Sequence, residues 1–162
     1  MRKKLLLMII VLLLVFSAGN VFAQKYNGLA LGLGYTANPF GGRWAGGMVT
    51  FHVPTSPLVF DLYPYWGNNG FGITLTGDWW IIRNPITGIL AWYLGPGLWV
   101  DFGIGNQFAL GLGARLAVGL QIWLLDRLEI FLEGAPGLGL YVIPSVSFAW
   151  PIPISLGFRW WF

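Results

Sequence analysis

Charged side chains in this 162-residue chain lie on one face of segments in which polar and apolar residues alternate. Arg115, Glu133 and Arg159 occupy similar positions in three successive segments, and Asp61 and Asp78 are expected to come close in a hairpin. Side chains on neighbouring strands reach one another diagonally, and close carboxylates repel unless a cation compensates them. The sequence therefore predicts one charge cluster made of these five residues.

Two roles are open for this predicted cluster. Buried charges are normally paired, so it can be a structural ion-pair network that fills and rigidifies the interior. It can also be a gate on a narrow ion path. Five inward-facing acids against two inward-facing arginines would make such a path favour cations; the acids are Asp61, Asp78, Asp101, Glu129 and Glu133.

Other chemistry-bearing residues are few. His52 is the only histidine, and with Ser155 and Glu129 it supplies the residue types of a Ser-His-acid hydrolase. No nucleophile motif surrounds the serine, and nothing in the spacing brings the three together. His52 cannot build a metal site without more histidines or a tight carboxylate cluster, and the absence of cysteine excludes thiol catalysis. We expect no catalytic residues, no metal and no cofactor.

The segments that carry these residues alternate with a period of two, which is typical of β-strands. We expect Arg83-Asn84-Pro85 to end the fourth strand, a long connection at 143–150, and bulges at Pro64, Pro96 and Pro136, where a ladder donor is missing. The eight expected strands are Gly28 to Tyr35, Trp44 to Val53, Leu58 to Trp66, Phe71 to Ile81, Gly88 to Phe102, Phe108 to Trp123, Leu128 to Val142 and Ile152 to Phe162.

The alternation has the same sense throughout, because Leu, Ile and Val share one face while small and charged residues share the other. Hydrophobic residues make up 56% of the chain and charged residues only 9%, which is too few charges to solvate an outer surface. The apolar face must therefore meet lipid, and closure into a barrel pairs every strand edge. We predict an all-β fold: an eight-stranded antiparallel transmembrane β-barrel, a closed up-and-down meander over residues 24–162, with both termini on the periplasmic side.

Aromatic side chains on the inner face lie among glycines, which predicts packing of large against small side chains. The alternative is a site or passage for a small hydrophobic ligand, for which a pocket must be vacant. The inner aromatics are Trp80, Trp99, Trp123, Trp161, Tyr63, Tyr93 and Tyr141.

The first 23 residues are typical of a cleaved secretory signal peptide. Arg2, Lys3 and Lys4 precede the apolar run 5–16, and Val21-Phe22-Ala23 forms the cleavage site. Cleavage leaves six basic and six acidic residues, so the net charge of +3 belongs to the leader and gives no indication of nucleic-acid binding.

The last segment ends on an apolar face that carries Phe158, Trp160 and Phe162, with no polar tail after it. It resembles the terminal strand of bacterial outer-membrane barrels. That resemblance implies that these three residues form a signal for the barrel-assembly machinery.

Four stretches go beyond a general strand pattern: L-T-G-D-W-W-I-I at 75–82, Y-L-G-P-G-L at 93–98, L-E-I-F-L-E-G-A-P-G-L-G-L at 128–140, and the ending G-F-R-W-W-F. Together they resemble a family of small outer-membrane barrels known best from spirochaetes, related in architecture to the OmpA-like, OmpX-like and OmpW-like barrels of Gram-negative bacteria. The resemblance covers most of the chain after residue 23, and it brings no catalytic residues with it.

These observations predict an integral outer-membrane protein with a side-chain-filled lumen, a structural or surface role and no enzymatic activity. Its expected partners are outer-membrane lipid and the assembly machinery, and no nucleic acid. The alternative is a porin-like narrow channel or carrier for small or hydrophobic solutes, and a more distant one is a lipid-modifying enzyme.

Overall fold

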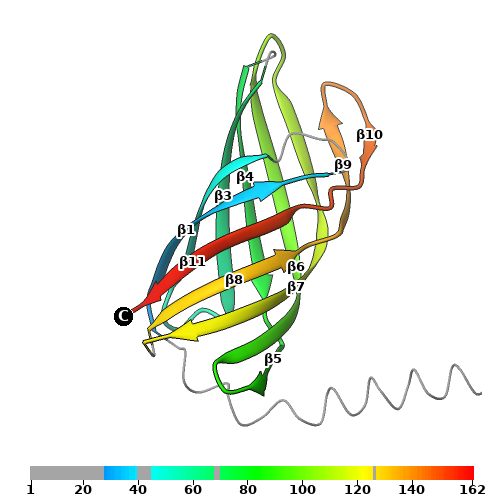
Figure 1. Cartoon of the computed structure of the whole chain (residues 1–162). Coiled ribbons are helices and arrows are strands. Elements are labelled where there is room, and N and C mark those ends of the chain that lie inside the picture. The colour runs from blue at the N-terminus through cyan, green and yellow to red at the C-terminus, as the bar shows by residue number, and fades with distance from the viewer. Residues whose placement is uncertain (1–27, 40–44, 68–69, 126) are drawn as a thin grey trace, which may run out of the picture.

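Strand segments form a single antiparallel sheet that closes on itself (Figure 1). The computed structural model describes residues 28–39, 45–67, 70–125 and 127–162, and the expected signal peptide lies outside them. The strands are β1 (Ala30–Ala37), β2 (Gly46–His52), β3 (Leu58–Gly67), β4 (Gly70–Trp79), β5 (Ile82–Thr87), β6 (Leu90–Gly105), β7 (Ala109–Leu124), β8 (Leu128–Gly134), β9 (Gly137–Ile143), β10 (Ser147–Ala149) and β11 (Ile154–Trp161).

The ring closes through β1, which pairs with β11 on one side and with β2 on the other. Its order is β1-β2-β3-β4-β6-β7-β8-β11. Across short breaks, β5 continues β4, β9 continues β8, and β10 leads into β11. The molecule is therefore the predicted closed, eight-stranded, up-and-down barrel. Among the described residues, no helix is long and apolar enough to cross a membrane.

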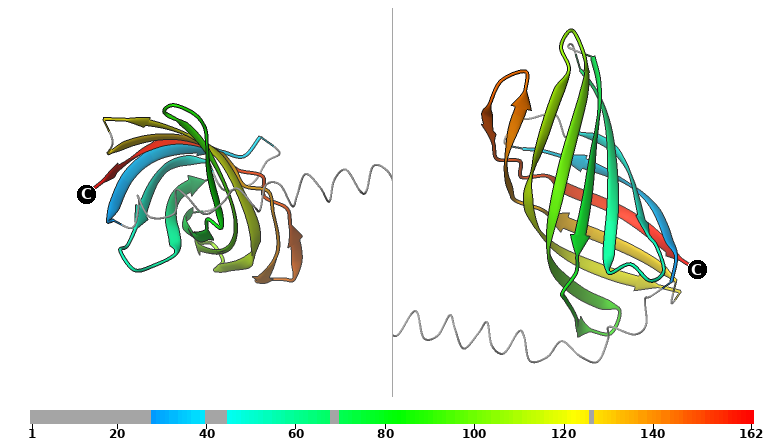
Figure 2. Two further views of the ribbon diagram at one scale, coloured as in Figure 1. Left: turned by 90° about the horizontal axis from the view of Figure 1, so that it is seen from below. Right: turned by 180° about the vertical axis from the view of Figure 1, so that it is seen from behind.

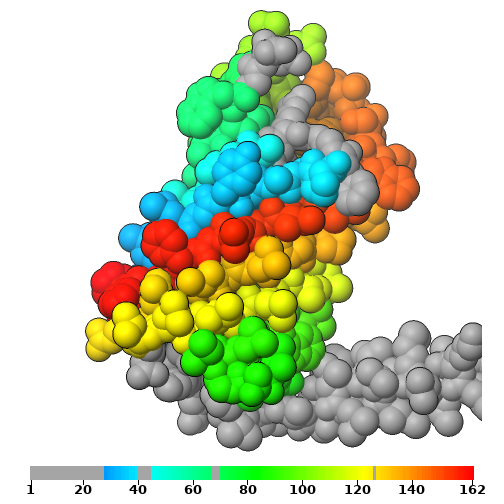
Figure 3. Space-filling model, in the orientation of Figure 1, coloured from blue at the N-terminus to red at the C-terminus, as the bar shows by residue number. Residues whose placement is uncertain are grey.

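The barrel is taller on one side than on the other (Figures 1 and 2). The long hairpin of β6 and β7 runs the full height of the barrel. The strands β1, β8 and β11 are strongly tilted relative to that hairpin. The β9–β10 hairpin continues the wall beside the upper part of β7, with β9 paired to β7 and β10 paired to β9. In Figure 3, β1, β11 and β8 lie side by side on the near face.

Two of the expected breaks between strands contain a strand instead. Arg83-Asn84-Pro85 does not end the fourth strand but lies within β5, and the turn comes at Gly88 and Ile89, where Gly88 has a φ of 48°. Proline is tolerated in β5 because this segment pairs only with β6, and proline is compatible with an edge. The expected connection at 143–150 contains β10, which extends the last strand.

The expected bulges are absent at Pro64 and Pro96, whose cross-strand pairs run in regular register. Pro64 lies beyond the β2–β3 pairing, which ends at Leu62, so its missing N–H faces no ladder on that side. Pro96 lies opposite the break between β4 and β5. At Pro136 the strand is interrupted between β8 and β9, but Val118 pairs with Gly134 and Arg115 with Gly137 in one register, so the expected bulge is absent there too.

Burial along the strands is the reverse of that in a water-soluble barrel. In β11, Ser155, Arg159 and Trp161 are buried, whereas Leu156 and Phe158 are 58% and 46% exposed. The same alternation runs along β7, where Arg115 and Gln121 point inward. The inner and outer faces therefore agree with those predicted from the sequence.

Candidate functional site

Arg115 lies at the centre of the charged lumen. Its cross-strand partners are Gly97 on β6 and Gly137 on β9, so no neighbouring side chain crowds it on its own wall. The Nη2 atom lies 2.9 Å from Asp78 Oδ2, 2.5 Å from Glu133 Oε1 and 3.7 Å from an oxygen of Asp61. Carboxylates from β3, β4 and β8 thus converge on one guanidinium that crosses the barrel.

Arg159, on β11, forms a second centre of the charge cluster. Its Nη1 donates to Glu129 Oε1 at 2.7 Å, and its Nε donates to Thr50 Oγ1 at 2.7 Å. Nη2 lies 3.8 Å from Asp61, so that carboxylate joins the two arginines. The guanidinium carbon also lies 3.8 Å from the ring centre of Phe131 and 4.8 Å from that of Trp80, both within cation–π range.

The structure therefore brings together all five residues of the predicted cluster, and each of them is buried. Whether the cluster has a structural or a gating role stays a prediction.

Several members of this network are missing from the sequence prediction. Glu129 accepts hydrogen bonds from Gln121 Nε2 and from the indole N–H of Trp161, both at 2.8 Å. The hydroxyl of Tyr93, on β6, donates to Glu133 Oε2, on β8, at 2.6 Å. The strand β7 lies between these two strands in the sheet. The alternation in the sequence already placed these side chains on the inner face. Which of them meet depends on how the strands are arranged around the closed barrel.

Asp101 belongs to a separate polar cluster nearer the tall end of the barrel. Its carboxylate accepts hydrogen bonds from Thr74 Oγ1 at 2.7 Å, from Tyr141 Oη at 3.0 Å and from Tyr65 Oη at 3.2 Å. Hydroxyl groups, and not an arginine, therefore bind the Asp101 carboxylate. The inner acids do not form one continuous row.

Aromatic rings fill the space that glycines leave on the inner wall. A Cβ added at Gly119 would lie 2.2 Å from the Tyr93 ring, and one at Gly139 would lie 2.4 Å from the Trp99 ring. Large side chains at several heights are fully buried, among them Trp99, Tyr63, Phe131 and Arg159. This is the predicted packing of large against small, and it occupies the lumen at the level of the charges.

The carboxylates of Asp61, Asp78 and Glu133 lie close enough to hold a metal ion, with one oxygen from each within 4.8 Å of the others. The Arg115 guanidinium lies against all three, so a protein cation already occupies this position. The arrangement fits an internal ion-pair network, and we assign no metal to it.

The residue types of a hydrolase are not brought together. Ser155 donates to Thr36 Oγ1 at 2.9 Å, whereas His52 Nδ1 lies 2.7 Å from the carbonyl oxygen of Gly28. Along β1, the partners of Ser155 and His52 are Thr36 and Ala30, six residues or about 20 Å apart.

The three residues of the expected assembly signal, Phe158, Trp160 and Phe162, are exposed on the outer face at the end of the chain. Their position leaves them accessible from outside the barrel, and their role as a signal stays a prediction.

Comparisons with protein-family models, curated proteins and solved structures found no match to this chain. The resemblance to small spirochaetal outer-membrane barrels therefore stays an expectation from the sequence.

Proposed function

We propose that this protein is an integral outer-membrane barrel with a filled lumen, and that its role is structural or at the cell surface, without enzymatic activity. The reversed distribution of side chains supports this proposal most strongly. Leucines such as Leu33 and Leu156 are more than half exposed, whereas Asp61 and Arg159 are fully buried.

The apolar outer surface of the barrel is compatible with a lipid environment. Apolar side chains exposed on strand after strand would be unfavourable in water, and in hydrocarbon every backbone N–H and C=O must be paired within the protein. A closed antiparallel sheet meets that second condition. The exposed terminal aromatics fit recognition by the assembly machinery after export.

The filled lumen favours a structural role over a conducting one. The interior of an eight-stranded barrel is just wide enough to be filled by side chains. Here Arg115 and Arg159 reach across to carboxylates on other strands, and the side chains of Trp99 and Phe131 are also buried in the interior. A porin-like channel or a carrier for small or hydrophobic solutes would require these groups to move.

Membrane insertion is tested by fluorescence quenching. Protein lacking residues 1–23 is folded into vesicles of phosphatidylcholine whose acyl chains carry bromine, and its tryptophan emission is compared with that in unbrominated vesicles. Strong quenching is expected, because Trp66, Trp79 and Trp160 lie on the outer surface. Equal emission in the two kinds of vesicle would contradict the proposal.

The filled lumen is tested by single-channel recording in a planar bilayer. Wild-type protein is expected to be silent. Reproducible conductance steps in the wild type that grow in Arg115→Ala would instead identify the charge cluster as a gate and establish the channel alternative.

A further inference from the structure

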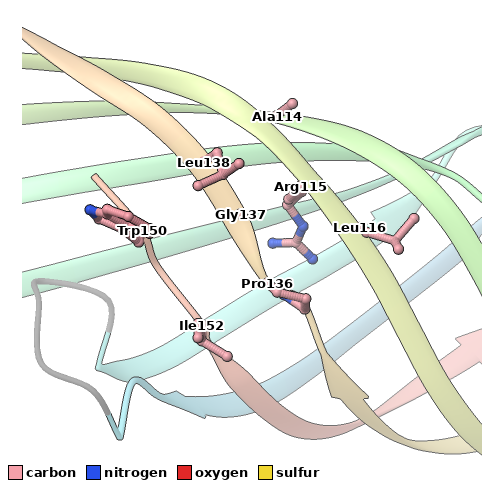
Figure 4. Close-up of a pocket in the computed structure, with 8 residues that line it drawn as sticks. All are labelled: Ala114, Arg115, Leu116, Pro136, Gly137, Leu138, Trp150 and Ile152. Atoms are coloured by element: carbon pink, nitrogen blue, oxygen red, sulfur yellow. The ribbon is translucent and has the colours of Figure 1, made fainter. Parts of the chain in front are cut away.

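A groove of about 480 Å³ lies on the outer wall, where β8 gives way to β9 and β10 to β11 (Figure 4). Its side chains are apolar and come from three neighbouring strands: Ala114, Leu116, Pro136, Leu138, Trp150 and Ile152. Arg115 also borders it, but that side chain is fully buried, so the groove ends at the wall and does not reach the charge cluster.

Strand register explains the shape of the groove. Ala114 pairs with Leu138, and the neighbouring pair Ala149 with Gly139 brings Trp150 beside that leucine. A second row contains Leu116, Pro136 and Ile152, two residues further along each strand. Ala114 is the smallest of these outward side chains, and the proline interrupts the pleat, which leaves a hollow between the two rows.

The backbone around the groove offers no site for an added peptide strand. The N–H of Leu116 donates to the carbonyl of Pro136 at 2.9 Å, and the N–H of Gly137 donates to that of Pro151 at 2.8 Å. The N–H of Ala135 donates to the carbonyl of Pro153 at 3.0 Å. Strand addition requires free edge groups, so these bonds favour an occupant that needs no backbone partner.

The lining chemistry points to hydrocarbon. No charged side chain opens into the groove, and it is continuous with the outer apolar wall, where Leu112 and Leu132 are exposed. Its volume lies within the range of about 300–1,000 Å³ that is usual for small-ligand sites. Trp150, at the rim and 72% exposed, carries an indole N–H that can donate to an ester or headgroup oxygen.

We propose that this groove binds one acyl chain of a membrane phospholipid, with Trp150 placed beside the glycerol ester region. The inference rests on the proposed membrane location, because the acyl chain reaches the groove from the surrounding bilayer. It adds a specific lipid site to a wall that otherwise contacts lipid non-specifically.

Native mass spectrometry tests the site. Wild-type protein, Ala114→Phe and Leu120→Phe are folded in dioleoyl phosphatidylcholine vesicles, extracted into detergent and weighed intact. Leu120 is the matched control, since it lies outward on the same strand but outside the groove. A difference in gel migration between unboiled and boiled samples first shows that each variant is assembled.

The expected result is one retained phospholipid on the wild type and on Leu120→Phe, and its loss from Ala114→Phe, because the added ring fills the hollow. Equal retention by all three proteins, or none by the wild type, would overturn the inference. A dimer that persists in the wild type and disappears in Ala114→Phe would show that a second copy occupies the groove instead. Brominated-lipid quenching of the same samples reports separately on membrane insertion, so failure of the proposed function is distinguishable from failure of this site.

Discussion

Removal of the Arg115 charge should destabilise the barrel strongly. Arg115→Met keeps a long apolar stem of similar length but leaves Asp78 and Glu133 without the guanidinium that contacts them at 2.9 and 2.5 Å. Breaking a buried ion pair by removing one partner costs about 3–5 kcal/mol. The unfolding equilibrium constant should therefore rise by roughly two to more than three orders of magnitude, at 1.4 kcal/mol per tenfold change.

The same reasoning predicts rescue when the carboxylates are neutralised together with the arginine. The triple variant Arg115→Met, Asp78→Asn, Glu133→Gln leaves Asp61 as the one charged side chain of the four, and Asp61 keeps its contact with Arg159. Replacing a whole buried charged group is often close to neutral. The triple variant should therefore regain most of the stability that Arg115→Met loses.

Equilibrium unfolding by urea in phospholipid vesicles, followed by tryptophan fluorescence, measures both variants against the wild type. The reasoning is refuted if Arg115→Met unfolds within about 0.5 kcal/mol of the wild type, the range of an ordinary surface substitution. It is refuted equally if the triple variant is as unstable as the single one, since that would mean the stem packing of Arg115, and not its charge, stabilises the barrel.

Two further substitutions test the packing and the chain end. Gly119→Ala should cost about 1–3 kcal/mol of unfolding free energy, because its Cβ would overlap the Tyr93 ring, whereas Gly134→Ala, with open space around it, should be neutral; equal urea midpoints would contradict this. Phe162→Ser should lower the amount of assembled barrel in cells, measured by heat-modifiable migration on a gel, relative to Phe148→Ser, which changes another exposed phenylalanine away from the chain end. Unchanged assembly would remove the terminal-signal hypothesis.

Much of the fold could be predicted from the sequence because strand periodicity is a local property. The parity of a residue within its segment decides whether it points inward, and Arg115, Glu133 and Arg159 are buried as their parity indicates. Strand ends were less predictable. Pro85 reads locally as a strand breaker, yet β5 tolerates it because one edge of that segment has no neighbour, a fact that only the completed sheet supplies.

The contacts within the lumen depend on how far each strand is shifted relative to its neighbour when the ring closes. Inward parity places Asp101 and Asp78 on the same face, but the register gives the first to Thr74, Tyr65 and Tyr141 and the second to Arg115. The same holds for the outer groove, because its lining side chains, among them Ala114, Pro136 and Ile152, come from segments that meet only in the closed sheet. The sequence by itself determined which side chains face inward or outward, since that follows from a two-residue repeat along one strand. Tertiary structure alone decided which of them meet, since that follows from the stagger and closure of all the strands together.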